Sequence, residues 1–197
     1  MIETLKQWDT SLFLLINGAH SSFWDQVMWF VSARLTWLPL YLLIAFLIIR
    51  KFRHKSIIIL LLIVPLLILI SDQLSVHLFK NVFHRLRPCH DPDIQNLVHL
   101  VRNHCGGRYG FVSSHASNSV GLAVLSILLL RNRIFLWAIL AWALLVSYSR
   151  IYLGVHFPGD VLAGGMFGFL AGALAWYAYR VIDYYWLSRS RSFNKQY

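Results

Sequence analysis

The sequence has few charged residues for its length. Asp, Glu, Lys and Arg make up only 13% of its 197 residues, whereas 58% are hydrophobic. A soluble domain usually has about 25% charged and about 45–50% apolar residues, so this composition excludes an ordinary soluble globular protein. Because the apolar excess extends along the whole chain, it indicates a polytopic membrane protein with one domain.

Acidic residues are especially scarce. There are 8 Asp and Glu against 18 Lys and Arg, which gives a net charge of +10. The sequence contains no dense carboxylate cluster of the kind that a magnesium site uses. Nucleic-acid binding is one explanation of the basic excess. We set it aside because much of the charge lies in short clusters between apolar runs, as in loops that orient membrane helices.

Cysteine is nearly absent. The two cysteines, Cys89 and Cys105, fall in one polar stretch. Two interpretations are open: unrelated thiols, or a disulfide that closes a loop on the oxidising side of a membrane. The first residues, MIETLKQWD, have neither a basic start nor an adjacent apolar core. We therefore expect no signal peptide.

The N-terminal residues 1–26 alternate apolar and polar positions at helical spacing. The apolar positions are Leu5, Trp8, Leu12, Leu15 and Ile16. This pattern predicts an amphipathic helix that lies on the bilayer surface. We divide the chain into this interfacial segment, a membrane domain over residues 27–183 and a basic cytoplasmic tail over residues 184–197.

Five apolar stretches follow that are candidates for membrane spans. They cover approximately residues 28–49, 56–79, 114–130, 134–148 and 159–182. The first contains Arg34, which we expect near an end or facing the protein. A span needs about 20 residues, so the ends of the short third and fourth stretches should lie in the headgroup zone. The prediction is a bundle of about five transmembrane helices plus the interfacial helix.

Two features inside these stretches indicate helix packing. Asp72 interrupts the second stretch, and a hydrogen bond to a neighbouring helix is its main interpretation, with proton or substrate handling as the alternative. Gly164, Gly168 and Gly172 recur at four-residue spacing in the last stretch. Such a row lets another helix approach closely, and we favour packing within the bundle over dimerisation. The oligomeric state is open.

Loop charges predict the orientation. Three groups of cations lie between the first and second stretches, between the third and fourth, and after the fifth: Arg50, Lys51, Arg53 and Lys55; Arg131 and Arg133; and Arg189, Arg191 and Lys195. With five spans all of them fall on one side, which should be cytoplasmic. We therefore expect a multi-pass protein of the inner (cytoplasmic) membrane with its C-terminus in the cytoplasm. The loops at 80–113 and 149–158 then face the periplasm or exterior.

Three segments at the edges of the apolar stretches carry residues suited to phosphate chemistry. They are Lys80–Pro88 (KNVFHRLRP), Val112–Ala116 (VSSHA) and Ser149–Asp160 (SRIYLGVHFPGD). Lys80 and Arg87 are two helical turns apart and could clamp one phosphoryl group, although snorkelling interfacial cations are the simpler interpretation.

The other two segments add a helix start and a histidine–carboxylate pair. Ser113 and Ser114 suit a helix N-cap, where free N–H groups also bind phosphate, and His115 could donate a proton there. Asp160 follows His156 by four residues and could orient its imidazole for attack, or simply favour a helix N-terminus. Each simple interpretation is credible alone, but together the segments favour a phosphate site at one membrane face.

The three segments resemble the pattern of the type-2 phosphatidic acid phosphatase / vanadium haloperoxidase superfamily, which is K-x6-RP, then PSGH, then SR-x5-H-x3-D. The matching residues are Lys80, Arg87 and Pro88, then Ser113 and His115, then Ser149, Arg150, His156 and Asp160. The second element departs from the pattern, because Val112 and Ser114 replace its Pro and Gly. The resemblance covers about residues 28–182.

The resemblance implies an all-helical bundle that needs no metal or other cofactor. It implies that His156 attacks phosphorus and forms a phosphohistidine, that Asp160 orients His156, and that His115 protonates the leaving oxygen. The implied phosphate ligands are Lys80, Arg87, Ser113, Ser114 through its N–H, and Arg150. Such cations stabilise the charge on the phosphoryl oxygens during transfer.

The expected function is a membrane phosphatase acting on a lipid phosphate. Undecaprenyl diphosphate is the favoured substrate, and phosphatidylglycerophosphate, phosphatidic acid and the 1-phosphate of lipid A are the others. A lipid phosphotransferase using the same phosphohistidine and a non-catalytic lipid-binding protein or transporter are the alternatives. A haloperoxidase is less favoured because those relatives are soluble.

Overall fold

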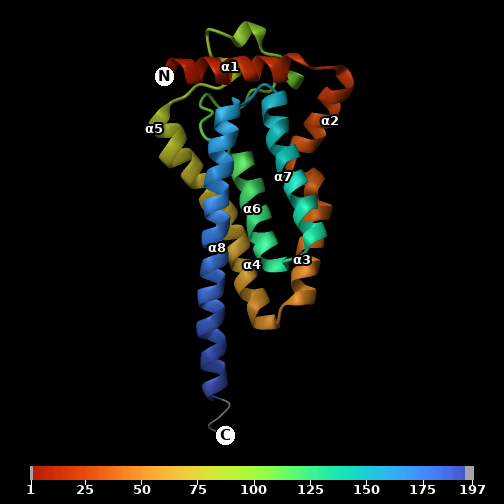
Figure 1. Ribbon diagram of the computed structural model, residues 1–197, viewed down its shortest axis with the longest axis vertical. Coiled ribbons are helices and arrows are strands. Elements are labelled where there is room, and N and C mark those ends of the chain that lie inside the picture. Colours follow the sequence, from red (N-terminus) through yellow and green to blue (C-terminus); the bar gives the residue numbers. More distant parts are fainter. Residues whose placement is uncertain (1, 194–197) are drawn as a thin grey trace.

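The computed structural model is an elongated helical bundle with one helix lying across one end (Figure 1). It describes residues 2–193, without the side chains of residues 2, 76, 78, 80, 81 and 187–193. The helices are α1 (Ile2–Gly18), α2 (Ser22–Ser32), α3 (Leu38–Lys51), α4 (His54–Leu74), α5 (Asn81–Phe83), α6 (Ser114–Leu130), α7 (Arg133–Tyr152) and α8 (Pro158–Phe193). Within the described residues, the one β pairing is an isolated bridge between Leu86 and Tyr109. The predicted all-α fold is confirmed.

Helix α6 forms the centre of the bundle, packed against α4, α7 and α8. Its contact with α8 uses the glycine row: a Cβ on Gly168 would lie 2.2 Å from the Ser117 carbonyl oxygen, and one on Gly164 would lie 2.5 Å from that of Ser113. On the α4 side, the Ser71 hydroxyl bonds that of Ser117. The glycine row therefore serves packing within the bundle, as we favoured.

The expected span over residues 28–49 is not a single helix. It breaks at Ala33, whose backbone is extended, and the segments on either side, Ser22–Ser32 and Arg34–Lys51, meet at 68°. The carbonyls freed at the break are satisfied by side chains: Thr36 Oγ1 donates to Phe30 O at 2.6 Å and Trp37 Nε1 to Val31 O at 2.7 Å. Because these bonds replace helical ones, the break leaves neither carbonyl unpaired.

Three other helices within the described residues are long and apolar enough to cross a membrane. They are His54–Leu74, Arg133–Tyr152 and Pro158–Trp186, and the broken pair would make a fourth span. Helix α6 is apolar but has only 17 residues. The count of about five spans thus stays a prediction.

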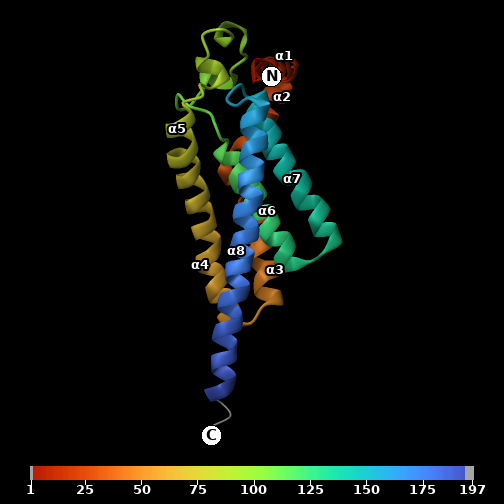
Figure 2. The ribbon, with the colours of Figure 1, turned by 60° about the vertical axis from the view of Figure 1, so that its left-hand side comes forward.

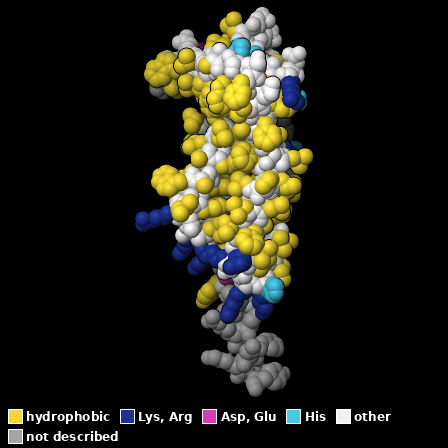
Figure 3. All heavy atoms as spheres, turned by 90° about the vertical axis from the view of Figure 1, so that its right-hand side faces the viewer, with side chains coloured by type: hydrophobic (Ala, Val, Ile, Leu, Met, Phe, Trp, Pro, Cys, Tyr) yellow, Lys and Arg dark blue, Asp and Glu magenta, His cyan; other side chains and the backbone are white. Residues whose placement is uncertain are grey.

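The two ends of the bundle differ in charge. Figure 3 shows apolar side chains over the middle of the molecule and Lys and Arg side chains gathered toward the end opposite α1. Lys51 at that end donates to the Leu130 carbonyl at the C-terminus of α6. Helix α8 runs on through Phe193, so the basic tail expected from residue 184 begins inside a helix; Lys195 lies outside the described residues, as do the side chains of Arg189 and Arg191.

Helix α1 lies across the other end, and Figure 2 shows it nearly end-on above the bundle. Most of the expected apolar stripe faces away from the protein, since Trp8 is 70% exposed and Leu15 is 72% exposed. Ile16 is the exception, because it is half-buried against the cluster that contains Phe13. The opposite face is anchored, since Phe13 is fully buried and Asn17 donates to the carbonyls of His99 and Tyr152 at 2.9 and 2.8 Å. Residues 2–26 of the predicted interfacial segment form α1 and the start of α2, and their place at the bilayer surface stays a prediction.

The glycine contact predicts a difference between two neighbouring substitutions. Gly168→Ala should destabilise the bundle by roughly 1–3 kcal/mol, because the new methyl group would overlap the Ser117 backbone. Gly165→Ala is the matched control, since its Cβ would meet only Val120 Cγ2 at 3.7 Å. Thermal unfolding in detergent checks this, and equal melting temperatures for the two variants would contradict the packing argument.

The exposed stripe of α1 predicts contact with lipid. A nitroxide on Leu12→Cys should be relaxed by dissolved oxygen more than by a water-soluble nickel complex once the protein is in bilayers. A nitroxide on Gln7→Cys, an exposed polar position on the same helix, is the control and should show the reverse preference. Electron paramagnetic resonance measures both, and the same preference at both positions would argue against an interfacial α1.

Candidate active site

The connection between α7 and α8 holds a buried histidine–carboxylate pair. Gly154 turns the chain there with a φ of +78°, a conformation that favours glycine. His156 is 2% exposed and Asp160 is fully buried. Asp160 Oδ2 lies 3.5 Å from His156 Nδ1 and accepts the Phe157 backbone N–H at 3.1 Å. Asp160 therefore accepts a backbone N–H at the start of α8 and also faces the imidazole. Stabilising the helix N-terminus and orienting His156 are thus compatible roles for this residue.

The start of α6 is fixed to the start of α8. Ser113 is the N-cap of α6, and its hydroxyl accepts the Ala116 N–H. Its own backbone N–H donates to the Asp160 carbonyl oxygen at 3.0 Å. Ser114, the next residue, directs its hydroxyl to Ser75 of the segment after α4, at 2.6 Å. The first turn of α6 is thus held between α8 and α4.

His115 lies where the three segments meet. It interacts electrostatically with His156 and with three arginines, Arg34, Arg87 and Arg150. Two of these arginines come from the predicted segments, whereas Arg34 comes from the break before α3. The structure therefore brings His115, His156, Asp160, Arg87, Arg150 and Ser113 together. The side chain of Lys80 lies outside the described residues.

Arg87 is held by backbone carbonyls. Its Nε donates to Tyr109 O at 3.3 Å, and its Nη1 donates to Cys105 O at 3.2 Å and Val155 O at 3.5 Å. Burial lowers the pKa of the Arg87 guanidinium, and the nearby Asp160 carboxylate partly offsets this. An arginine nevertheless stays protonated in proteins, so Arg87 brings a fixed positive charge to the site.

Arg150 has bonding capacity to spare. Its Nη1 donates to the Ser32 hydroxyl, but its buried Nε has no hydrogen-bond partner among the described residues. The positive charges of Arg87 and Arg34 also act on Arg150. Because buried donors are normally paired, an unpaired Nε among three like charges points to an anionic ligand.

Several neighbours of this site were not predicted to lie there; for Arg34, sequence analysis expected only a place near a helix end or facing the protein. Ser32 and Arg34 reach it only because the helix breaks at Ala33, which the unbroken apolar stretch does not indicate. Arg85, inside the first segment, bonds Asp160 rather than belonging to the clamp that we drew from Lys80 and Arg87. The spacing of the segment identified its ends but not this interior contact.

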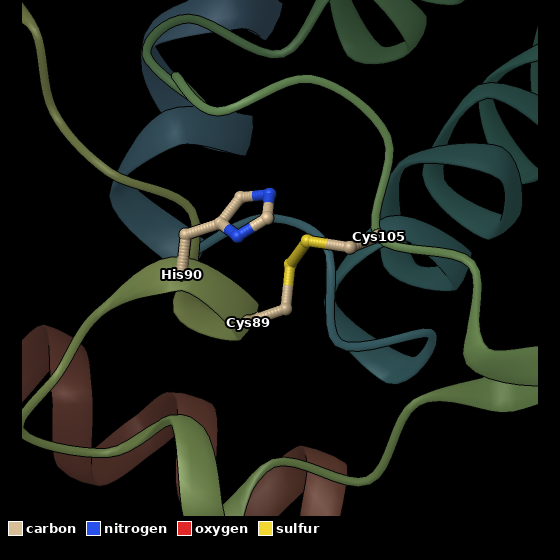
Figure 4. Close-up of side chains that lie close together, drawn as sticks. All are labelled: Cys89, His90 and Cys105. Atoms are coloured by element: carbon tan, nitrogen blue, oxygen red, sulfur yellow. A yellow bond between two sulfur atoms is a disulfide. The ribbon is translucent and has the colours of Figure 1, made fainter.

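The loop that carries Arg87 is closed by a disulfide between Cys89 and Cys105, beside the exposed ring of His90 (Figure 4). The three side chains are close enough to hold a metal ion by distance alone. Because the two sulfurs are bonded to each other, neither is available as a thiolate ligand. The disulfide instead fixes the Cys105 carbonyl that accepts from Arg87.

An apolar groove of about 710 Å³ leads from His115 along the bundle between α3 and α4. Its far part is lined by aliphatic side chains, including Ile49 and Leu61, which are 58% and 67% exposed and so mark its open side. Its near end is polar and contains Arg34, Asp72 and Asn118. Asp72 thus lines the groove near the site.

Comparisons with known proteins find relatives that match most of the chain. Two lipid A 4'-phosphatases are similar along most of their length. The one from Bacteroides thetaiotaomicron is 38% identical over 90% of this chain and 79% of the relative, and the one from Porphyromonas gingivalis is 35% identical over 96% and 80%. An undecaprenyl-diphosphatase from Sulfolobus acidocaldarius is 33% identical over 82% of this chain and 73% of the relative.

A solved structure shares the fold. The phosphatidylglycerolphosphate phosphatase from Bacillus subtilis, described as a transmembrane PAP2 type enzyme, matches with a TM-score of 0.66 at 23% identity, covering 91% of this chain and 86% of that one. The named relatives are phosphatases, which confirms the enzyme class predicted from the sequence. The model of the PAP2 superfamily matches residues 61–183, which include all three segments, and the chain belongs to this superfamily.

Proposed function

We propose that the protein hydrolyses a phosphomonoester on an acylated sugar lipid of the lipid A type, releasing inorganic phosphate, with His156 as the nucleophile. The observation that carries the proposal is the buried Arg150 Nε, which has no partner among the described residues. The positive charges of Arg34, Arg87 and Arg150 all act on the neighbouring His115. A phosphoryl group would supply the missing anion and acceptor.

The proposed reaction has two steps. The Nε2 of His156 attacks phosphorus while the bond to the lipid oxygen breaks, and His115 donates a proton to that oxygen. Water then attacks the phosphohistidine, His115 takes a proton from it, and inorganic phosphate leaves. Asp160 faces the other ring nitrogen, Nδ1, and stabilises the charge that forms on the ring.

The proposed phosphate ligands are Lys80, Arg87, Ser113, the Ser114 N–H and Arg150. Arg87 and Arg150 are the most strongly supported, because both are half-buried and their charges act on His115. Arg34 lines the polar end of the groove and adds positive charge there without being counted as a ligand. Arginine suits this task because its fork of donors matches two phosphoryl oxygens.

The lipid tail would occupy the groove between α3 and α4. Its apolar walls and its open side match a substrate that keeps its chains in the bilayer. The similarity to two lipid A 4'-phosphatases over at least 90% of this chain supports a lipid A type phosphate. Undecaprenyl diphosphate, favoured by the sequence, is the second candidate, since the Sulfolobus relative is named for it.

The orientation belongs to the same proposal. The α1 end would face the periplasm or exterior, and the cationic end would face the cytoplasm, in accord with the loop charges. The Cys89–Cys105 disulfide supports this placement, because such bonds persist in oxidising compartments.

A substrate panel tests the proposal. Purified protein would be assayed in bilayers with a chelator present, against lipid A, undecaprenyl diphosphate and phosphatidylglycerophosphate side by side. We expect phosphate release from lipid A at the highest kcat/KM. A higher value for undecaprenyl diphosphate would favour the second candidate, label recovered in an acceptor lipid would favour a phosphotransferase, and no release would contradict the function.

His156→Ala should lower kcat by at least about 1000-fold, because no other group would form the covalent intermediate. Wild-type protein quenched at alkaline pH after brief exposure to labelled substrate should carry label that acid removes, as expected of a phosphohistidine. His90→Ala, a change at an exposed loop histidine nearby, is the matched control and should stay active. Near-normal turnover by His156→Ala would reject the mechanism.

A further inference from the structure

Arg85 joins the active-site carboxylate to the helix that lies across the bundle. Its Nη1 donates to Asp160 Oδ1 at 2.9 Å, and its Nη2 donates to Asp9 Oδ2 of α1 at 2.5 Å. Asp160 is fully buried and Asp9 is largely shielded, with 16% of its side chain exposed. One guanidinium therefore bridges two carboxylates that are 151 residues apart in sequence.

The bridge divides the two oxygens of Asp160 between different tasks. Oδ1 binds Arg85, whereas Oδ2 accepts from the Phe157 N–H and faces His156. A carboxylate held at both oxygens cannot rotate about its last bond without breaking a charge-assisted hydrogen bond. The direction in which Oδ2 faces the imidazole is thus set by Arg85.

Asp9 in turn ties α1 to the start of α8. Its Oδ1 accepts the Gly159 N–H at 2.7 Å, and a Cβ on Gly159 would lie 2.8 Å from Asp9 Oδ2. Only glycine lets α1 approach so closely at this point. Arg85 also lies over the Phe157 ring at 4.4 Å, and Phe157 packs edge-on against Phe13 of α1. Salt bridge, backbone bond and ring contacts all converge on the residues beside His156.

We propose that Asp9 and Arg85 are positioning residues that hold Asp160 in register with His156, so that α1 is part of the catalytic apparatus rather than a peripheral anchor. This inference rests on the proposed function. Asp9 fixes Arg85, Arg85 fixes Asp160, and Asp160 fixes the imidazole. The opposite, exposed apolar face of α1 would lie in the lipid surface, which places one end of this chain of contacts at the bilayer.

The test compares single substitutions along the bridge in protein reconstituted in bilayers. Asp9→Asn and Arg85→Gln should each lower kcat by about 10- to 100-fold, as for other residues that orient a reacting ligand through a hydrogen bond, with KM changed less than about threefold. Because both act through one path, the double variant should be little worse than Arg85→Gln alone. Asp9→Glu, which keeps the charge, should recover most of the loss.

Matched controls separate positioning from charge and from folding. Glu3→Gln removes an exposed carboxylate from α1, and Arg108→Gln removes a cation from the same loop as Arg87; both should keep normal kcat. If Arg85→Gln does not fold, Asp9→Asn with an unchanged melting temperature decides. Normal kcat in Asp9→Asn, or a loss confined to KM, would overturn the inference. Inactive wild-type protein would instead reject the proposed function.

Discussion

The rest of the site depends on the contacts made by Asp160, whose carboxylate is buried. Its side chain faces His156 and binds Arg85, and its backbone carbonyl accepts the Ser113 N–H that begins α6. Gly110 is needed beside it, since a Cβ there would lie 2.9 Å from Asp160 Oδ2. A buried charge is costly unless it is paired. Because the partners of Asp160 come from all three segments, pairing this carboxylate favours a fold in which the segments lie together.

The break between α2 and α3 also determines which residues reach the site. An unbroken helix through residues 28–49 would carry Ser32 and Arg34 along a straight wall of the bundle. The extended backbone at Ala33 instead brings the Ser32 hydroxyl to Arg150 and adds Arg34 to the charge around His115. Thr36 and Trp37 lower the energetic cost of the break by donating hydrogen bonds to the freed carbonyls. An irregular backbone can therefore persist within an apolar stretch.

Sequence patterns predicted the all-α fold, the glycine packing row, the family and several of the residues that the structure brings together, such as His115, His156 and Asp160. These follow from local rules: apolar periodicity, small-residue spacing and motif spacing. The Ala33 break was missed because an apolar run does not show that the side chains of Thr36 and Trp37 will bond the carbonyls of Phe30 and Val31 six residues earlier. The Arg85 bridge was missed because its partners lie 76 residues upstream and 75 residues downstream, and only the tertiary fold pairs them. The choice among lipid phosphates has no local code either.

The open side of the α3–α4 groove has a consequence for how binding is measured. Exposed Ile49, Leu61 and Leu69 would border hydrocarbon, not water, so an arriving chain exchanges one apolar neighbour for another. Hydrophobic transfer then contributes little net affinity, and recognition falls to the charged end near His115. The substrate then reaches the enzyme by diffusion within the membrane. The occupancy of the groove therefore depends on the mole fraction of substrate in the bilayer rather than on its bulk concentration.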